Sequence, residues 1–251
     1  MNREASRPIT RSPSPTFSPL YRQIKEFMIK SLEEGEWGPG DAIPSEAELA
    51  AHFNVSQGTV RKAIDEMAAE NLLVRRQGKG TFVATHDDPR SAYRFLRLIP
   101  DSGANEHSVS KPLSCRSFAA STEVAAALQI ATGDPVVAVE RLLRFEGEPV
   151  VLDQIFLVGE LFPGLTLERL RASERSLYSL FENDYGVRMI RAEERLRAVS
   201  ADAHSAKLLA VAEGSALLLI ERTAFTYGNK PVEWRRGLYS TRRHHYLNEL
   251  G

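Results

Sequence analysis

Apolar residues recur at helical spacing in three successive segments near the start of the chain. The first predicted helix has Ser18 as its N-cap and Pro19 as its first residue, and Gly35 ends it. The second opens with the capping box at 45–48, and the third follows Ser56. The apolar stripes of the three helices are Leu20, Ile24, Phe27, Met28 and Leu32, then Leu49 and Phe53, then Val60, Ile64 and Met67.

Two β-rich runs follow these helices and predict a hairpin. Residues 72–76 and 81–83 are separated by the basic, glycine-bearing tip at 77–80. Three helices followed by a two-stranded wing, all within residues 18–85, are the layout of a winged helix-turn-helix domain. The Pro- and Ser-rich residues 1–17 predict a disordered tail before it.

The pattern changes after the polar residues 86–91, which we predict to be a linker. Residues 92–251 contain strand-like runs at 93–99, 113–118, 136–145, 149–157, 188–200, 216–226 and 231–239. Helical stretches lie between them at 122–128, 176–185 and 202–209, and the hairpin turns are at 146–148 and 228–230. Successive hairpins with interspersed helices predict an antiparallel α+β domain rather than a parallel nucleotide-binding sheet.

Composition and charge narrow the class of protein without naming a partner. The 32 Lys and Arg residues nearly balance the 33 Asp and Glu residues, so no strong overall field favours nucleic acid or membrane. The single Cys excludes a disulfide framework and a Cys-based zinc site, and we expect Cys115 to be a buried small residue rather than a reactive thiol. No membrane span or signal peptide is evident, so we expect a cytoplasmic protein without membrane contact, metal or cofactor.

The third predicted helix carries side chains suited to reading a major groove. Its first turns present short polar and basic residues while its apolar residues face inward. A solvated charged helix would show the same residues, but the order of capped helix, basic helix and basic wing favours DNA binding. The candidate DNA-binding residues are Ser45, Gln57, Thr59, Arg61, Lys62, Arg75, Gly78, Lys79 and Gly80.

These residues resemble the GntR family of bacterial transcription regulators. The matching motifs are 43–46 (IPSE), 49–50 (LA), 55–56 (VS), 59–63 (TVRKA) and 77–83 (QGKGTFV). The resemblance implies a homodimer on a palindromic DNA operator, with the helix after Ser56 in the major groove and the wing tip near the minor groove. Many family members have Arg where this chain has Ala47 and Gln57, which implies an altered operator or weaker binding.

The second half of the chain resembles the UTRA domain, which accompanies the branch of this family named after the histidine-utilisation repressor. The matching landmarks are 133–136 (GDPV), 140–142 (ERL), 147–150 (GEPV), 176–178 (SLY), 185–186 (YG), 218–222 (LLIER), 230–233 (KPVE) and Tyr239. The resemblance implies a chorismate-lyase-like antiparallel fold that acts as an effector sensor and dimerisation domain.

The same resemblance implies a pocket for a small-molecule effector with an anionic group. Its candidate residues are Arg141, Asp153, Ser176, Arg191, Glu233 and Tyr239. A second family Arg is Leu143 here, which weakens the case for a phosphorylated effector because a phosphate dianion usually binds several cations. Ordinary ion pairs are the alternative, Arg141 with Glu140 or Glu221 and Arg191 with Glu233. We expect the basic cluster at 242–245 to be a solvated face.

The sequence favours a ligand-responsive, DNA-binding transcriptional regulator, and a repressor released by a small acidic metabolite in particular. One alternative is a DNA-binding dimer whose second domain only dimerises. Another is an enzyme, because the implied fold is shared with a lyase. The chain shows no nucleophile–base pair, metal-spaced cluster or phosphate-binding loop, so we expect no enzymatic activity.

Overall fold

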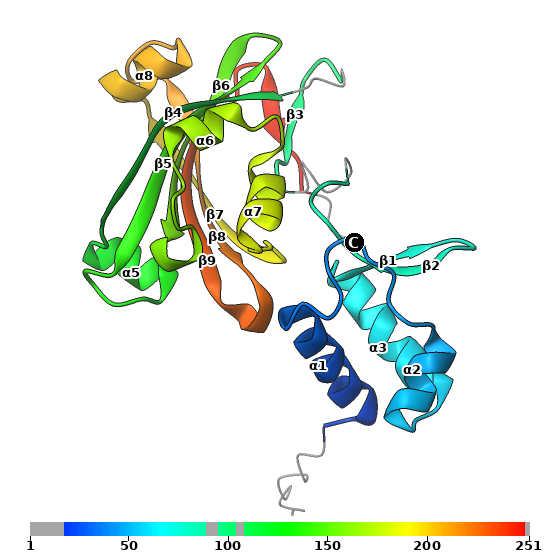
Figure 1. Ribbon diagram of the computed structural model, residues 1–251. Helices are drawn as coiled ribbons and strands as arrows, with labels where there is room; N and C mark the ends of the chain where they lie inside the picture. Colours follow the sequence, from blue (N-terminus) through cyan, green and yellow to red (C-terminus); the bar gives the residue numbers. More distant parts are fainter. Residues whose placement is uncertain (1–17, 89–94, 104–107, 249–251) are drawn as a thin grey trace, which may run out of the picture.

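The computed structural model describes residues 18–88, 95–103 and 108–248. The tail predicted at 1–17 and residues 89–91 of the predicted linker lie outside the described residues. Figure 1 shows a small helical body with a hairpin, built from the first part of the chain, beside a larger curved sheet with helices packed on it. The α+β class predicted from the sequence is confirmed.

The small body contains three helices and a hairpin, as the apolar pattern predicts. Its elements are α1 Leu20–Glu33, α2 Glu46–Phe53, α3 Gln57–Ala69, β1 Leu73–Arg76 and β2 Gly80–Val83. The stripes meet in one core, in which Met28, Val60 and Met67 are fully buried. The prediction is wrong for Leu20 and Phe27, which are 51% and 55% exposed because they lie on the outer side of α1. Burial of apolar area contributes roughly 25 cal/mol per Å², so this shared core fixes α3 against the other two helices.

Local hydrogen bonds set where the helices begin. The Ser45 hydroxyl accepts from the backbone N–H of Glu48 at 3.3 Å, and the Glu48 carboxylate accepts from the Ser45 N–H at 2.8 Å, which completes the predicted capping box. The Ser56 hydroxyl caps α3 by accepting from the N–H of Thr59 at 3.2 Å. The prediction for α1 is wrong by one residue: Pro19 has extended backbone angles and is itself the N-cap, without a side-chain cap.

The large body is a six-stranded antiparallel sheet in the order β4-β5-β6-β9-β8-β7. Its strands are β4 Ser108–Ala119, β5 Pro135–Phe145, β6 Glu148–Val158, β7 Arg191–Ser200, β8 Ala216–Phe225 and β9 Pro231–Tyr239. Glu146 and Gly147 join β5 to β6 with positive φ at both residues (47° and 86°), the geometry of a two-residue hairpin turn. A separate pair joins β3 Leu98–Pro100 to β10 His244–Tyr246.

Helices cover both faces of the large sheet. They are α5 Thr122–Leu128, α6 Leu167–Ala172, α7 Leu177–Tyr185 and α8 Ala203–Leu209. Side chains alternate between the faces along each strand, so Val137 and Ile155 pack toward α6 and α7 while Val136 and Leu152 pack toward α5 and α8. In Figure 1, α7 lies within the curve of the sheet on the side that faces the helical body.

Two elements, α6 and β10, are absent from the sequence prediction. Both are very short, and β10 pairs with β3 from the other end of the domain, so its local pattern carries no sign of a partner. The expectation of a solvated face at 242–245 is wrong for His244, which is buried with its ring centroid 5.1 Å from that of Phe145.

Gly237 on β9 provides space for two buried side chains. A Cβ atom at this position would lie 2.5 Å from Cε2 of Tyr239 and 2.8 Å from Oδ1 of Asp153. Asp153 has no exposed surface and Tyr239 is 3% exposed, so neither side chain can move aside. The absence of a side chain at Gly237 therefore determines how tightly β6 and β9 pack in this region.

We expect Gly237→Ala to destabilise the protein by about 1–3 kcal/mol, the usual cost of overpacking a filled interior. Urea unfolding followed by circular dichroism measures the change. Gly58→Ala is the control: its position on α3 has no contact closer than 3.8 Å, so we expect unchanged or slightly higher stability there. Equal stability of Gly237→Ala and the wild type would contradict this account.

Candidate DNA-binding surface and effector pocket

The first turns of α3 present their polar side chains to solvent. Gln57, Arg61 and Lys62 are exposed, whereas the Thr59 hydroxyl lies 2.9 Å from the hydroxyl of Ser56. Lys62 also places its ammonium group 4.0 Å from the ring centroid of Tyr21 on α1, a cation–π contact. These exposed side chains have the chemistry that major-groove reading requires.

Glu46, the first residue of α2, joins the basic side chains of α3 and the wing. Its carboxylate lies 2.8 Å from the Arg61 guanidinium and 3.0 Å from that of Arg75, and Arg75 also contacts Asp65 at 2.7 Å. The hydrogen bond from Arg61 is the main reason that the pKa of Glu46 lies below its usual value. Two candidate DNA-binding arginines are therefore neutralised by acidic side chains of the same domain in this structure.

The wing ends in a turn that brings basic and backbone groups to its tip. Gly78 and Gly80 have φ of 70° and 108°, in the region that favours glycine, and no atom lies within 4 Å of where their Cβ atoms would be. Lys79 is exposed between them. Arg76, which the sequence prediction did not include, packs over the Phe82 ring at 4.5 Å.

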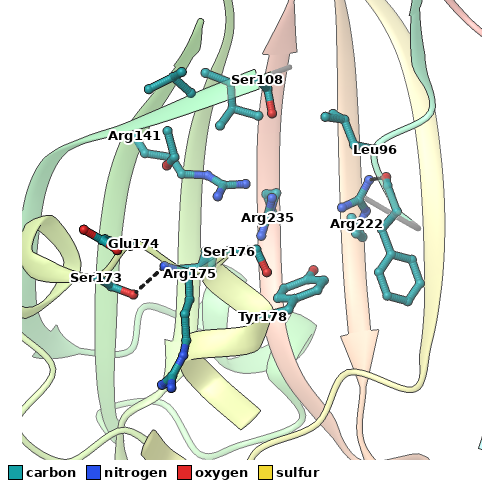
Figure 2. Close-up of a pocket in the computed structure, with 15 residues that line it drawn as sticks. Leu96, Ser108, Arg141, Ser173, Glu174, Arg175, Ser176, Tyr178, Arg222 and Arg235 are labelled. Atoms are coloured by element: carbon teal, nitrogen blue, oxygen red, sulfur yellow. Dashed lines mark hydrogen bonds between the residues drawn. The ribbon is translucent and has the colours of Figure 1, made fainter. Parts of the chain in front are cut away.

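A cavity of about 380 Å³ lies between the sheet and the N-terminal end of α7. Arg141 of β5, Arg222 of β8 and Arg235 of β9 supply its cationic wall, and Ser176 stands at the start of α7. Figure 2 shows Arg141 and Arg235 directing their guanidinium groups toward the same space, with the Tyr178 ring below them. Convergent polar groups in one small hollow are typical of a small-molecule site.

Buried carboxylates hold the arginines of this cavity in place. The Asp153 carboxylate accepts from Arg141 at 2.9 Å and from Arg235 at 3.1 Å, and Arg235 also makes two 3.0 Å hydrogen bonds to Glu233. Burial opposes ionisation of Asp153, but the guanidinium groups of Arg235 and Arg141 bring its pKa below the usual value. We define these four residues as the ion cluster.

Two tyrosines adjoin the ion cluster. The Tyr178 hydroxyl donates to the Glu233 carboxylate at 2.9 Å. Burial, assisted by the nearby carboxylate of Glu233, raises the pKa of Tyr178 to about 12, and burial near Asp153 has the same effect on Tyr239. Both phenols are therefore neutral at physiological pH.

The structure brings together five of the six candidate effector residues and separates the sixth. Ser176 and Arg141 line the cavity, and Asp153, Glu233 and Tyr239 are buried in contact with its arginines or beside them. Arg191 does not line this cavity: its guanidinium hydrogen-bonds to the Asn229 side chain and to Glu193 and lies over the Phe225 ring at 4.0 Å. Neither alternative ion pair is present, because Arg141 is buried against Asp153 and Glu233 is bound to Arg235.

The sequence prediction missed Arg222, Arg235 and Tyr178. Arg222 and Arg235 occur in largely buried strands, and each has a carboxylate partner on a neighbouring strand. Charged residues are rarely fully buried unless paired, so an arginine in an apolar strand is the available signal. Their partners Glu194 and Asp153 lie far away in the sequence, so these pairings were not predictable from it.

Helix α7 also contacts the segment that leaves the wing. Glu182 accepts from the hydroxyl of Thr85 and, at 3.0 Å, from the backbone N–H of His86. Asn183 donates to the Asp87 carboxylate at 3.1 Å, and the Ser179 hydroxyl binds the same carboxylate. His86, at the start of the predicted linker, is therefore buried against the second domain.

Arg188, just after α7, reaches back to the DNA-binding domain. Its guanidinium donates to the backbone carbonyl of Asn71 at 3.1 Å and lies 3.5 Å from the Glu182 carboxylate. It also donates to the Tyr227 hydroxyl at 3.0 Å. The end of α3 and the exit of the wing are thus both bonded to the same part of the second domain.

The described residues contain no group of three or more side chains that could hold a metal ion. Among those residues, no helix combines the length and apolar character needed to cross a membrane. Cys115 is half-buried with its Sγ atom 3.5 Å from the carbonyl of Leu165, and burial raises the pKa of its thiol. A raised thiol pKa lowers the thiolate fraction and therefore the reactivity.

Comparison with protein families gives two matches that together span most of the chain. Residues 20–83 match the gntR family of bacterial regulatory proteins, and residues 104–245 match the UTRA domain. The uncharacterized HTH-type transcriptional regulator YurK of Bacillus subtilis is 32% identical, over 90% of this chain and 93% of its own length. The histidine utilization repressor of Pseudomonas putida is 28% identical, over 90% of each chain.

Solved structures agree with this assignment. The ligand-binding domain of a putative GntR-family transcriptional regulator from Bordetella bronchiseptica is 47% identical, covers 63% of this chain and 99% of its own, and superposes with a TM-score of 0.61. The possible transcriptional regulator YydK of Bacillus subtilis covers 91% of this chain and 99% of its own with a TM-score of 0.57, and at 18% identity it shows the fold alone. The chain belongs to the GntR family of transcriptional regulators, with a winged helix-turn-helix domain followed by a UTRA domain, and is not an enzyme.

Proposed function

We propose that this regulator is a cytoplasmic, homodimeric repressor that binds a palindromic operator and is released by a small acidic metabolite. Helix α7 carries this proposal, because its N-terminal end lines the cavity and its later turns hydrogen-bond to the exit of the wing. A ligand that alters the position of α7 would also alter the contacts that hold the DNA-binding domain. Several relatives, including the NagR protein of Bacillus subtilis, are named as repressors, which supports the direction of control.

The DNA-binding half of the proposal rests on the exposed polar start of α3 and on the basic wing. Gln57 and Arg61 lie on the solvent side of α3, opposite its buried apolar residues. Arg75 of the wing shares the Glu46 carboxylate with Arg61, so helix and wing present one continuous surface. This surface corresponds to the candidate residues chosen from the sequence, and we propose that they contact the operator.

Linkage determines what an effector must do in this scheme. The protein has one domain arrangement that fits DNA well and another that fits it poorly. An inducer lowers operator affinity only if it binds the second arrangement more tightly than the first. A protein whose second domain only dimerises would show no such coupling. A ligand that changes both thermal stability and operator affinity therefore distinguishes a sensor from a simple dimeriser.

Selection of the purified full-length protein on random DNA duplexes at physiological salt tests the DNA-binding proposal. We expect enrichment of a two-fold symmetric site, because a homodimer presents two identical reading heads. No enrichment by a folded protein would contradict the proposal. If a site is enriched, the genes beside that site in the source genome will indicate the regulated pathway and hence the effector.

We expect Arg61→Ala to weaken operator binding by about 1–3 kcal/mol, the range for losing a base or phosphate contact. Fluorescence anisotropy with the selected operator measures the loss. Arg116→Ala is a matched control, since Arg116 is an exposed arginine on β4 of the other domain. The same effect from both variants would mean that only net charge matters, and the assignment of Arg61 would fail.

Glu46 competes with DNA for two arginines, so its removal should strengthen non-specific binding. We expect Glu46→Gln to bind random duplexes more tightly. The slope of the logarithm of the association constant against the logarithm of the salt concentration should steepen by up to about 0.9 for each arginine that gains a phosphate contact. Glu123→Gln on α5 makes the same charge change in the second domain and serves as the control. Unchanged or weaker binding would mean that Glu46 instead holds Arg61 in its DNA-bound orientation.

The bonds of Glu182 and Arg188 should be needed for release but not for either binding event. The double variant Glu182→Gln with Arg188→Met removes both charges of this buried ion pair at once, so no unpaired charge remains in the interior. We expect operator affinity and effector affinity, each measured alone, to stay within about threefold, while the effector's ability to weaken operator binding falls several-fold. Calorimetric titration of the effector with and without operator measures this coupling, and an unchanged coupling would overturn the role of α7.

A further inference from the structure

Strand β7 is one edge of the six-stranded sheet, and along the described part of the chain its backbone pairs only with β8. All ten of its residues follow one uninterrupted register with β8, and none of them is buried. The strand contains neither proline nor glycine. On its outer side it therefore presents a regular row of backbone N–H and C=O groups, which is a template for a further strand.

The opposite edge strand of the sheet, β4, is protected against such pairing. Pro112 interrupts its row of backbone donors, and its register with β5 shifts between Pro112 and Ser114. The carbonyl of Pro112 also accepts a hydrogen bond from Arg171 on α6 at 3.4 Å. Prolines, bulges and covering elements are common means of keeping an edge strand from pairing. Of the two edges of this sheet, β7 is thus the one that can accept a partner.

The charges of β7 complement a second copy of the same strand. Glu193, Arg195 and Arg197 alternate along one face of the strand. In an antiparallel pair centred on Arg195, Glu193 of each copy lies directly opposite Arg197 of the other, so two ion pairs form across the interface. The only like charges directly opposite each other are the two Arg195 side chains, and each of these also has Glu221 beside it on β8.

The neighbouring registers bring more like charges together. A pair centred on Glu194 places Arg191 opposite Arg197 twice and Glu194 opposite itself. A pair centred on Leu196 places Arg195 opposite Arg197 twice. Like charges directly opposite each other destabilise a strand pair. The sequence of β7 therefore favours the register centred on Arg195.

The same register also covers the exposed apolar side chain of the strand. Leu196 is 43% exposed and points to the opposite face from Arg195. In the register centred on Arg195, the two Leu196 side chains become diagonal neighbours across the new pair. Ala192 and Ala198 lie opposite each other on this face, and their small side chains leave room for the approach. A second copy thus complements the charges on one face and the apolar residues on the other.

We infer that two copies of this chain dimerise by antiparallel pairing of their β7 strands, with the two-fold axis at Arg195. The two six-stranded sheets then form one continuous sheet. The new pair contributes about one backbone hydrogen bond for each paired residue. This inference rests on the homodimer of the proposed function, and it adds the surface through which the two copies meet.

The pairing also sets the spacing of the two DNA-binding domains. Arg191, at the start of β7, lines a cavity together with Asn71 and Leu72, which follow α3. In the inferred register Arg191 lies opposite Val199, so the two Arg191 residues are about 26 Å apart along the strands, at about 3.3 Å per residue. This spacing is of the same order as the roughly 34 Å between half-sites one helical turn apart.

Cysteine cross-linking of the full-length protein in a Cys115→Ser background tests this interface. Directly opposite residues have Cα atoms about 4.5–5.5 Å apart, within the range of a disulfide. We expect Arg195→Cys to form a disulfide-linked dimer on mild oxidation at least ten times faster than Glu193→Cys or Arg197→Cys, whose thiols would be about 13 Å apart. Non-reducing electrophoresis measures the rates. Val109→Cys, which is exposed on β4, is the matched control and should not cross-link.

Charge reversal tests the inferred ion pairs without thiol chemistry. Arg197→Glu places a glutamate opposite Glu193 twice, and we expect it to raise the dissociation constant of the dimer at least tenfold. The double variant Glu193→Arg with Arg197→Glu exchanges the partners and should return that constant to within about threefold of the wild-type value. Arg116→Glu makes the same charge change at an exposed position of β4 and is the control. Sedimentation velocity measures the constants.

Three results would overturn the inference: a monomeric protein, cross-linking at Arg195→Cys that is no faster than at the other positions, or a charge exchange that fails to restore the dimer. Its failure is distinguishable from failure of the proposed function. A dimer that selects a symmetric DNA site but does not cross-link through β7 loses only this interface. A dimer that cross-links at Arg195→Cys but selects no DNA site keeps the interface and loses the proposed repressor role.

Discussion

The pairing of Arg235 with Asp153 and Glu233 is the interaction on which the second domain depends most. Two fully buried carboxylates, Asp153 on β6 and Glu233 on β9, lie on either side of Arg235, and each would be costly to desolvate alone. The Arg235 guanidinium bonds to both, and Arg141 bonds to Asp153 from the other side. Breaking one buried pair costs about 3–5 kcal/mol, so none of these side chains can change without the others. This network therefore holds Arg141 and Arg235 in place in the cavity wall.

Because this network holds the sheet side of the cavity, we propose that a ligand acts through the other side, which is α7. Tyr178 ties the first turn of α7 to Glu233, and Glu182 and Asn183 tie its later turns to the exit of the wing. The distance from cavity to DNA-binding domain is thus spanned by little more than two turns of one helix. We propose that this single short helix transmits the effect of a small ligand to the separate domain without rearrangement of the sheet.

Sequence reasoning predicted the DNA-binding domain more fully than the effector pocket, and the reason is the range of the interactions. The capping box, apolar stripes and glycine turn of the first domain act within a few residues, so the pattern around Ser45 or Gly78 is visible locally. The pocket depends on strand order, which places β9 between β6 and β8. Arg222, Arg235 and the distant position of Arg191 follow from that order, and no local pattern records it.

The two halves of the protein use opposed charges in different ways, and solvent explains the difference. Glu46 holds Arg61 and Arg75 at an exposed surface, where ion pairs contribute at most about 1 kcal/mol and phosphates can displace the acid at little cost. Asp153 and Glu233 hold their arginines in the interior, where displacement would leave a bare charge. We therefore expect a polyanion to exchange with the acid at the DNA-binding surface and an effector to leave the ion cluster intact. At each site, burial decides whether the protein's own acids can be displaced.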